Sequence, residues 1–185
     1  KYDIFISYRR SSYETANLIA TRLKSAGYRV FFDLESMRSG PFNEQLFNVI
    51  EGCRDFVIVL PPPDALERCH NEEDWVRKEV IHAMQHHKNI VPILLNGFHW
   101  PEVMPKGMEK LKMYQSVAAS VDFFDLAMKR LESYLKSSTH PKQRIFVRWF
   151  GAILIAILVL FLATYILNCR RIYQSNMLNT ITEVF

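Results

Sequence analysis

The chain has 185 residues, of which 49% are hydrophobic and 23% charged, and this balance excludes a disordered or low-complexity protein. The formal net charge of +4 is unevenly placed, because residues 1–136 hold 18 Lys and Arg against 18 Asp and Glu. This neutral part lacks the basic footprint that a phosphate backbone requires, so we expect no nucleic acid partner.

In chain order, the apolar runs predict strands over residues 2–8, 28–32, 55–60 and 89–95, with a weaker strand near 112–117. Helical periodicity predicts helices over residues 13–26, closed by Gly27, over a segment bearing Phe42, Leu46, Val49 and Ile50, over 72–87 and over 121–136. Strands that alternate with helices predict an α/β domain over residues 1–136. We expect five parallel strands with helices on both faces.

The residues that follow these strands are candidates for a binding crevice, because ligands of such sheets bind beyond the carboxyl ends of the strands. Tyr8, Arg9 and Arg10 end the first strand. The polar loop 33–41 follows the second strand, and the loop 96–101 follows the fourth. We expect these segments to surround one crevice.

Glu79 is an acidic residue in an unusual position on the predicted helix 72–87, beside its buried face. We expect Asn71 to cap this helix, and Val76, Val80, Ala83 and Met84 to form its buried stripe. Glu79 lies at the edge of the stripe, one turn after Trp75, where a carboxylate would be partly withdrawn from water. The alternative is a surface side chain paired with Arg77 or Lys78.

Metal and diphosphate sites have little support in the sequence. The six glycines form neither the G-x-G-x-x-G nor the G-x-x-x-x-G-K-[ST] phosphate-binding motif, and the three cysteines are far apart in the sequence. The histidines at 82, 86 and 87 lack the H-E-x-x-H pattern, so a solvated helix face is expected. We expect no metal site and no bound cofactor.

Five segments, in this order, resemble a TIR (Toll/interleukin-1 receptor) domain: YDIFISYRR, FFDLES, RDFVIVL, DWVRKEV and NIVPILLNGFHWPE. They resemble its NAD⁺-cleaving branch, which includes enzymes of animal axon degeneration, plant immune receptors and bacterial anti-phage effectors. The resemblance implies a flavodoxin-like TIR fold and NAD⁺ as substrate. It also implies that Glu79 is the catalytic residue.

The same resemblance implies roles for other residues. Arg9 and Arg10 match the pair that holds phosphates or ribose, although they could instead be surface charges at the end of a strand. The further substrate-binding candidates come from the crevice segments and the aromatic side chains; they are Tyr8, Asp33, Arg38, Phe42, Trp75 and Trp100. For Phe42 and Trp75, core packing is the alternative. Arg38 stands where the axon enzymes are acidic.

The tail contains an uncharged run over residues 149–167, long enough for a single transmembrane helix and bounded by Trp149 and Tyr165. Residues 137–148 form a basic linker before it, and 168–185 a short tail after it. No leader stands before the first motif. More basic residues precede the uncharged run than follow it, and this bias favours a cytoplasmic location for the part of the chain before the run. We therefore expect a protein anchored in the lipid bilayer by this single helix, with its TIR domain on the cytoplasmic side.

The sequence leaves three functions to be weighed. The first is a membrane-anchored NAD⁺ glycohydrolase or ADP-ribosyl cyclase, active when TIR domains self-assemble in defence or cell-death signalling. The second is a non-catalytic adaptor that signals through contacts between TIR domains. In the third, the membrane helix itself is the effector and forms pores when the domains cluster.

Overall fold

The first strand, β1 (Ile4–Tyr8), is buried along its whole length and lies inside the sheet, with a strand on each side. A computed structural model describes residues 1–32, 42–139, 161 and 164–165, and the side chains of 42–44 are not described. The other strands are β2 (Val30–Phe31), β3 (Asp55–Leu60), β4 (Asn89–Leu95) and β5 (Val117–Ala119). All the pairings are parallel, in the order β2-β1-β3-β4-β5, which confirms the predicted five-stranded parallel sheet.

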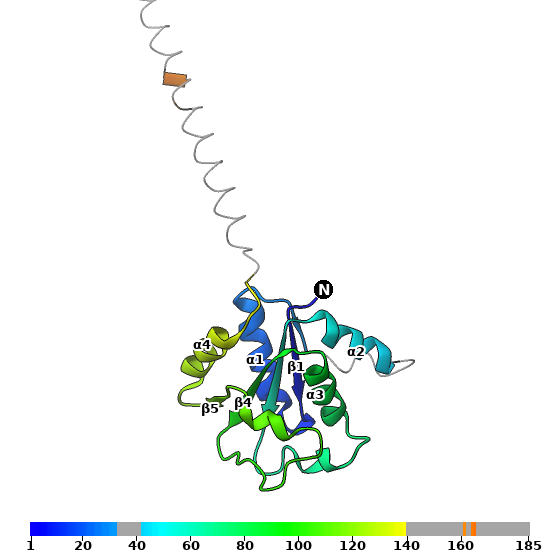
Figure 1. The fold of residues 1–185 in the computed structure, drawn as a ribbon. Helices are drawn as coiled ribbons and strands as arrows, with labels where there is room; N and C mark the ends of the chain where they lie inside the picture. Colours follow the sequence, from blue (N-terminus) through cyan, green and yellow to red (C-terminus); the bar gives the residue numbers. More distant parts are fainter. Residues whose placement is uncertain (33–41, 140–160, 162–163, 166–185) are drawn as a thin grey trace, which may run out of the picture. The chain divides into compact units, whose positions relative to one another are not determined.

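Four α-helices of the described residues cover the two faces of this sheet (Figure 1). Helices α1 (Tyr13–Ser25) and α4 (Phe124–Tyr134) pack on one face, and α2 (Phe42–Gly52) and α3 (Trp75–Gln85) on the other. Successive side chains of a strand point to opposite faces. In β1, Ile4, Ile6 and Tyr8 therefore join the α1 and α4 core, while Phe5 joins the α2 and α3 core.

Local sequence explains where α1 and α3 end or begin. Gly27 follows α1 with φ 101°, a left-handed conformation that terminates a helix and favours glycine. At α3 the cap is Asp74, whose carboxylate accepts a hydrogen bond from the Arg77 backbone amide, so the predicted cap at Asn71 is wrong. The Asn71 side chain instead accepts from the Glu73 amide in the preceding turn.

The last predicted strand is also displaced. Residues Glu109–Met113 form a short 3-10 helix, η4, and the strand β5 begins only at Val117. The expected strand over 112–117 is therefore wrong in position. Its sequence has few apolar residues, and the short strand that follows pairs only with β4.

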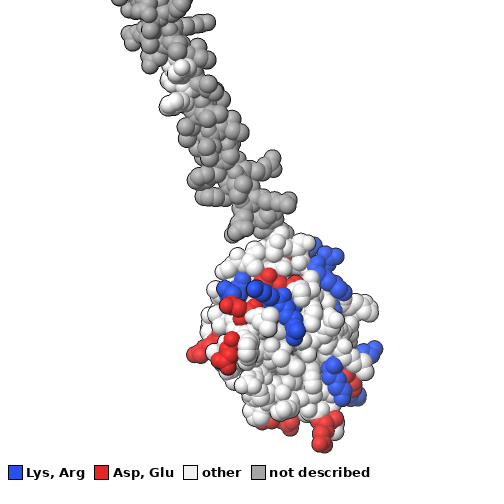
Figure 2. Space-filling model, turned by 90° about the vertical axis from the view of Figure 1, so that its left-hand side faces the viewer, with Lys and Arg blue, Asp and Glu red and all other residues white. Residues whose placement is uncertain are grey.

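Charges of both signs are interspersed on the face of residues 1–139 that Figure 2 shows. Charges of opposite sign also pair directly, as Arg22 of α1 does with Asp125 of α4. This mixture agrees with the neutral charge balance of residues 1–136.

The chain divides into two units, Lys1–His140 and Pro141–Phe185, and only the first is described in detail. Among the described residues, no helix has the length and hydrophobicity that crossing a membrane requires. The predicted span 149–167 lies outside the described residues except for Phe161, Thr164 and Tyr165. The tail 168–185 and most of the linker 137–148 also lie outside them.

Candidate active site

Ser7 and Glu79 meet between the sheet and α3. The alternation along β1 turns Ser7 to the face that α3 covers, where it is the polar member of an otherwise apolar strand. Its hydroxyl donates to the Glu79 carboxylate, with 2.6 Å between Ser7 Oγ and Glu79 Oε2. Glu79 is only 1% exposed, so it is a buried carboxylate and not the surface residue that was the alternative.

Burial changes the chemistry of this carboxylate. The loss of water contact raises the pKa of Glu79 from 4.5 to about 7, and the Asp74 charge also raises it. The Ser7 hydrogen bond and the Arg9 charge act in the opposite direction. At neutral pH Glu79 is therefore divided between its protonated and its ionised forms, and a nearby positive charge would favour the ionised form.

Arg9 is held by three contacts after the end of β1. Its Nη1 lies 2.6 Å from Asp74 Oδ2, its Nε donates to the Ala65 carbonyl at 3.0 Å, and its Nη2 donates to Cys69 Sγ at 3.0 Å. Arg9 thus ties the end of β1 to the segment before α3 and to the cap of that helix. Its fork of donors is directed at the protein in this structure, whereas the sequence suggested a substrate contact.

Asp74 has an environment opposite to that of Glu79, although Asp74 caps the helix in which Glu79 lies. Burial acts to raise the pKa of Asp74, but hydrogen bonds from Arg9 and from the Arg77 amide outweigh it and lower this pKa below its usual value. Cys69 also donates to Asp74, and burial raises the pKa of the Cys69 thiol to about 12. Cys69 is therefore a neutral thiol and not a nucleophile.

The remaining predicted site residues that the structure describes have different environments. Tyr8 is buried and stacks on Phe32 at 4.9 Å between ring centroids, which places it in the α1 and α4 core. Trp75 is 40% exposed, with the Lys78 ammonium 5.4 Å from its ring centroid. Trp100 is half-buried and meets Phe98 edge to face. Arg10 is exposed.

Three predicted substrate contacts cannot be placed. Asp33 and Arg38 lie outside the described residues. Phe42 is the first residue of α2, and its side chain lies outside them as well. Their roles stay predictions.

Sequence reasoning missed Ser7 and Asp74. A serine in an almost wholly apolar, buried strand is a signal that could have identified Ser7, because a buried hydroxyl needs a hydrogen-bond partner. Asp74 was passed over because Asn71 was the expected cap. Its pairing with Arg9, 65 residues away in the chain, is a tertiary contact that no local pattern reveals.

Comparison with known proteins finds similar proteins that are named NAD(+) hydrolases. The chain is 39% identical over 140 residues to the NAD(+) hydrolase sarm1 of Drosophila melanogaster, an alignment that covers 72% of this chain and 10% of that protein. It is 36% identical over 140 residues to the NAD(+) hydrolase tir-1 of Caenorhabditis elegans, covering 72% of this chain and 14% of that protein. The chain therefore spans between 10% and 14% of the length of these two relatives.

A solved structure has the same fold. The crystal structure of the TIR domain of the Toll-related receptor TRR-2 from Hydra magnipapillata matches with a TM-score of 0.52 and 20% identity, covering 74% of this chain and 100% of that one. The TIR domain family itself matches residues 4–133, which include all five strands and the helix that carries Glu79. On this evidence the chain belongs to the TIR domain family.

Proposed function

We propose that this chain cleaves the bond between nicotinamide and ribose in NAD⁺, with Glu79 as the catalytic residue. The observation that carries the proposal is the buried Glu79 carboxylate, hydrogen-bonded to Ser7 near the carboxyl end of β1, with a pKa of about 7. The relatives that share this stretch of chain are named NAD(+) hydrolases, which supports the same substrate.

One carboxylate is sufficient for this chemistry. Nicotinamide leaves as a neutral pyridine and takes the bonding electron pair with it, so the leaving group needs no proton. Positive charge then develops on the ribose ring, and an ionised Glu79 stabilises that charge more in the transition state than in the ground state. Water adds to the anomeric carbon and loses a proton, giving ADP-ribose, nicotinamide and one proton.

The cationic substrate also adjusts the state of Glu79. Burial disfavours the ionised form of Glu79, whereas a bound pyridinium ring favours it. The free carboxylate is therefore poorly stabilised and the bound one well stabilised. Because Glu79 is shielded from water, the attraction between its carboxylate and the bound pyridinium is stronger than it would be at the surface.

The substrate contacts belong to the same proposal. Arg10 is exposed after β1 and would meet the phosphates, while Arg9 would act on Glu79 through its charge and through Asp74. The rings of Trp75, Trp100 and Phe42 would flank the nicotinamide or the adenine. Asp33 and Arg38 would contact the substrate from the loop 33–41. Tyr8 would support the bound substrate from β1.

Assembly and membrane attachment complete the proposal. Glu79 is almost wholly buried in the single chain, which is consistent with a site that opens only when TIR domains assemble through the loop 33–41. The uncharged run 149–167 would anchor the chain in a lipid bilayer as one transmembrane helix, with the TIR domain on the cytoplasmic side. Anchoring would raise the local concentration of the domains and favour their assembly. The cellular role would be defence or cell-death signalling.

The test is turnover of NAD⁺ by the full chain in lipid vesicles at a density that clusters the TIR domains. We expect release of nicotinamide, which Glu79→Gln reduces by a factor of about 10³ while the folded state survives. Glu14→Gln, which removes an exposed carboxylate on α1, is the matched control and should keep full activity. Equal turnover in the Glu79→Gln chain would refute the catalytic assignment. Absence of turnover in every chain would leave the adaptor or the pore as the function.

A further inference from the structure

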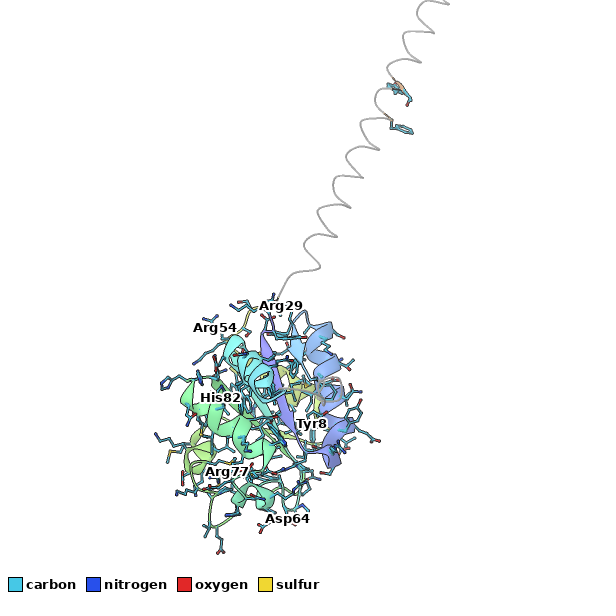
Figure 3. All side chains as sticks on the ribbon, turned by 90° about the vertical axis from the view of Figure 1, so that its right-hand side faces the viewer. Tyr8, Arg29, Arg54, Asp64, Arg77 and His82 are labelled. Carbon is cyan, nitrogen blue, oxygen red and sulfur yellow. The ribbon has the colours of Figure 1, made fainter. Side chains whose placement is uncertain are left out.

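Two histidines and a glutamate from different helices converge on the outer side of α2 and α3, away from the contact between Ser7 and Glu79. Glu51 lies in the last turn of α2. His82 lies on α3, and His86 is the residue that caps the end of that helix, so the two rings, four residues apart, lie side by side with 4.3 Å between their centroids. Glu51 Oε1 is 3.0 Å from His82 Nε2 and 3.5 Å from His86 Nε2. Figure 3 shows His82 on its helix.

We propose that Glu51, His82 and His86 form a binding site for one divalent transition-metal ion of the zinc class. One possible ligand atom from each residue lies within 4.8 Å of those of the other two. A zinc ion with bonds of 2.0–2.1 Å in tetrahedral geometry needs ligand atoms ~3.3 Å apart. The two measured separations, 3.0 and 3.5 Å, lie on either side of this value.

The side chains are also held in place before any ion binds. The His82 ring stacks on Phe47 of α2 with 4.4 Å between the ring centroids, and this contact fixes the orientation of the ring. Lys88 donates to the Glu51 backbone carbonyl and leaves the carboxylate to the histidines. The His82 side chain is 17% exposed, so it does not lie on the solvated face that the sequence suggested.

The ligand types select the class of ion. Two imidazole nitrogens and one carboxylate suit zinc, cobalt, nickel or copper, whereas magnesium and calcium prefer an all-oxygen shell. Glu51 and His86 also line an open pocket at the amino edge of the sheet, through which an ion and a water ligand can reach the site. Sequence motifs miss this site because the carboxylate precedes His82 by 31 residues on another helix.

A bound ion would join α2 to α3. The first of these helices follows the loop 33–41, and the second carries Glu79 one turn before His82. The ion would therefore stabilise the packing of two helices, and the folded state would gain the free energy of binding. The ion takes no part in the reaction proposed for Glu79.

The experiment titrates the tag-free full chain, kept in detergent, with Zn²⁺ in competition with a chromophoric chelator, and measures the thermal unfolding temperature with Zn²⁺ and with Mg²⁺. We expect one bound zinc ion and a rise in unfolding temperature with Zn²⁺ but not with Mg²⁺. His86→Ala and Glu51→Gln should each weaken zinc binding at least about tenfold, since each removes a direct ligand. Both residues are substantially exposed, so the fold should survive these changes.

His87→Asn is the matched control, because it removes the adjacent exposed histidine. His87 has φ 51°, a conformation that asparagine tolerates, so this variant should bind zinc as the unaltered chain does. Visible absorption of the Co²⁺ complex adds a second criterion, since histidine and carboxylate ligands give no thiolate charge-transfer band. Such a band would assign the ion to a cysteine and overturn the proposal. So would zinc affinity that is unchanged in both ligand variants, or no zinc binding at all.

Discussion

The two edges of the parallel sheet each enclose a buried carboxylate, and the protein treats the two in opposite ways. At the amino edge, Asp55 opens β3 and is completely buried. Three donors surround it: the Asn89 side-chain amide at 2.6 Å, the Lys136 backbone amide at 2.9 Å and the Ser137 backbone amide at 2.8 Å. These hydrogen bonds hold the chain beyond α4 against β3.

Toward the carboxyl edge, Glu79 is equally withdrawn from water, and this burial raises its pKa. Ser7 gives it a hydrogen bond, and burial outweighs that support. The comparison teaches that burial alone does not mark a functional carboxylate. The distinguishing property is how far the protein's own donors have satisfied the charge, since an incompletely stabilised carboxylate can still gain from a cationic ligand.

The largest effect expected from this comparison is on stability. Asp55→Ala would remove the acceptor that three partly buried donors share, so we expect a loss of about 3 kcal/mol in the free energy of unfolding. Urea denaturation measures this change, and Asp64→Ala, at an exposed aspartate, should change little. NAD⁺ turnover per folded molecule should stay the same in Asp55→Ala. A stability loss below 1 kcal/mol would mean that Asp55 is not the structural anchor described here.

The next effect concerns the pH dependence of stability. Between pH 4.5 and about 7 the folded chain keeps a proton on Glu79 that the unfolded chain releases, so this residue lowers stability as the pH rises through that interval. Glu79→Gln removes the effect. Relative to the unaltered chain it should gain up to about 3 kcal/mol between about pH 4.5 and pH 8. Denaturation of both chains across this pH range tests the prediction, and a constant difference would contradict it.

A smaller effect is expected in the pH profile of activity. If Glu79 must be ionised, kcat/KM should fall on the acid side of about pH 7, and Ser7→Ala should move this acid limb upward by about one pH unit, because the Ser7 hydrogen bond lowers the pKa of Glu79. Ser11→Ala, at an exposed serine, is the control and should leave the limb in place. A limb at the same pH in Ser7→Ala would show that another group governs the profile.

The smallest effect separates the two adjacent arginines. Arg10→Gln should raise the KM for NAD⁺ about threefold, and less at high salt, because it removes an exposed charge from the phosphates. Unfolding temperature should stay the same. Arg9→Gln should lower the unfolding temperature, because it removes the partner of Asp74. If instead Arg9→Gln changed KM alone, the structural account of Arg9 would be wrong.

Much of the fold could be predicted because its signals are local. Buried parallel strands are continuous apolar runs, and the helix over Tyr13–Ser25 shows an apolar stripe and a terminal glycine. Failures occurred where local signals compete. Asn71 and Asp74 are both good caps, and only the contact with Arg9 favours Asp74. The short strand at Val117 is marked by three small apolar residues, too few to define its position.

The candidate site was predictable in its central residue and less so in its surroundings. Helical periodicity placed Glu79 beside the buried stripe, and the structure puts it inside. The register of β1 decides that Ser7 meets it, and register depends on the whole sheet. The cluster of Glu51, His82 and His86 was missed for the same reason, since two helices must pack before the side chains converge.

The three contacts of Arg9 have a consequence for mutational scans of this chain. An arginine that braces a helix cap and a loop will score as essential in any screen that reads out function alone. Such a score would invite the inference that its guanidinium grips a ligand. Measuring the amount of folded protein beside every functional score would distinguish a structural residue from a ligand-binding one. It would also keep a structural residue from being targeted as part of a ligand pocket.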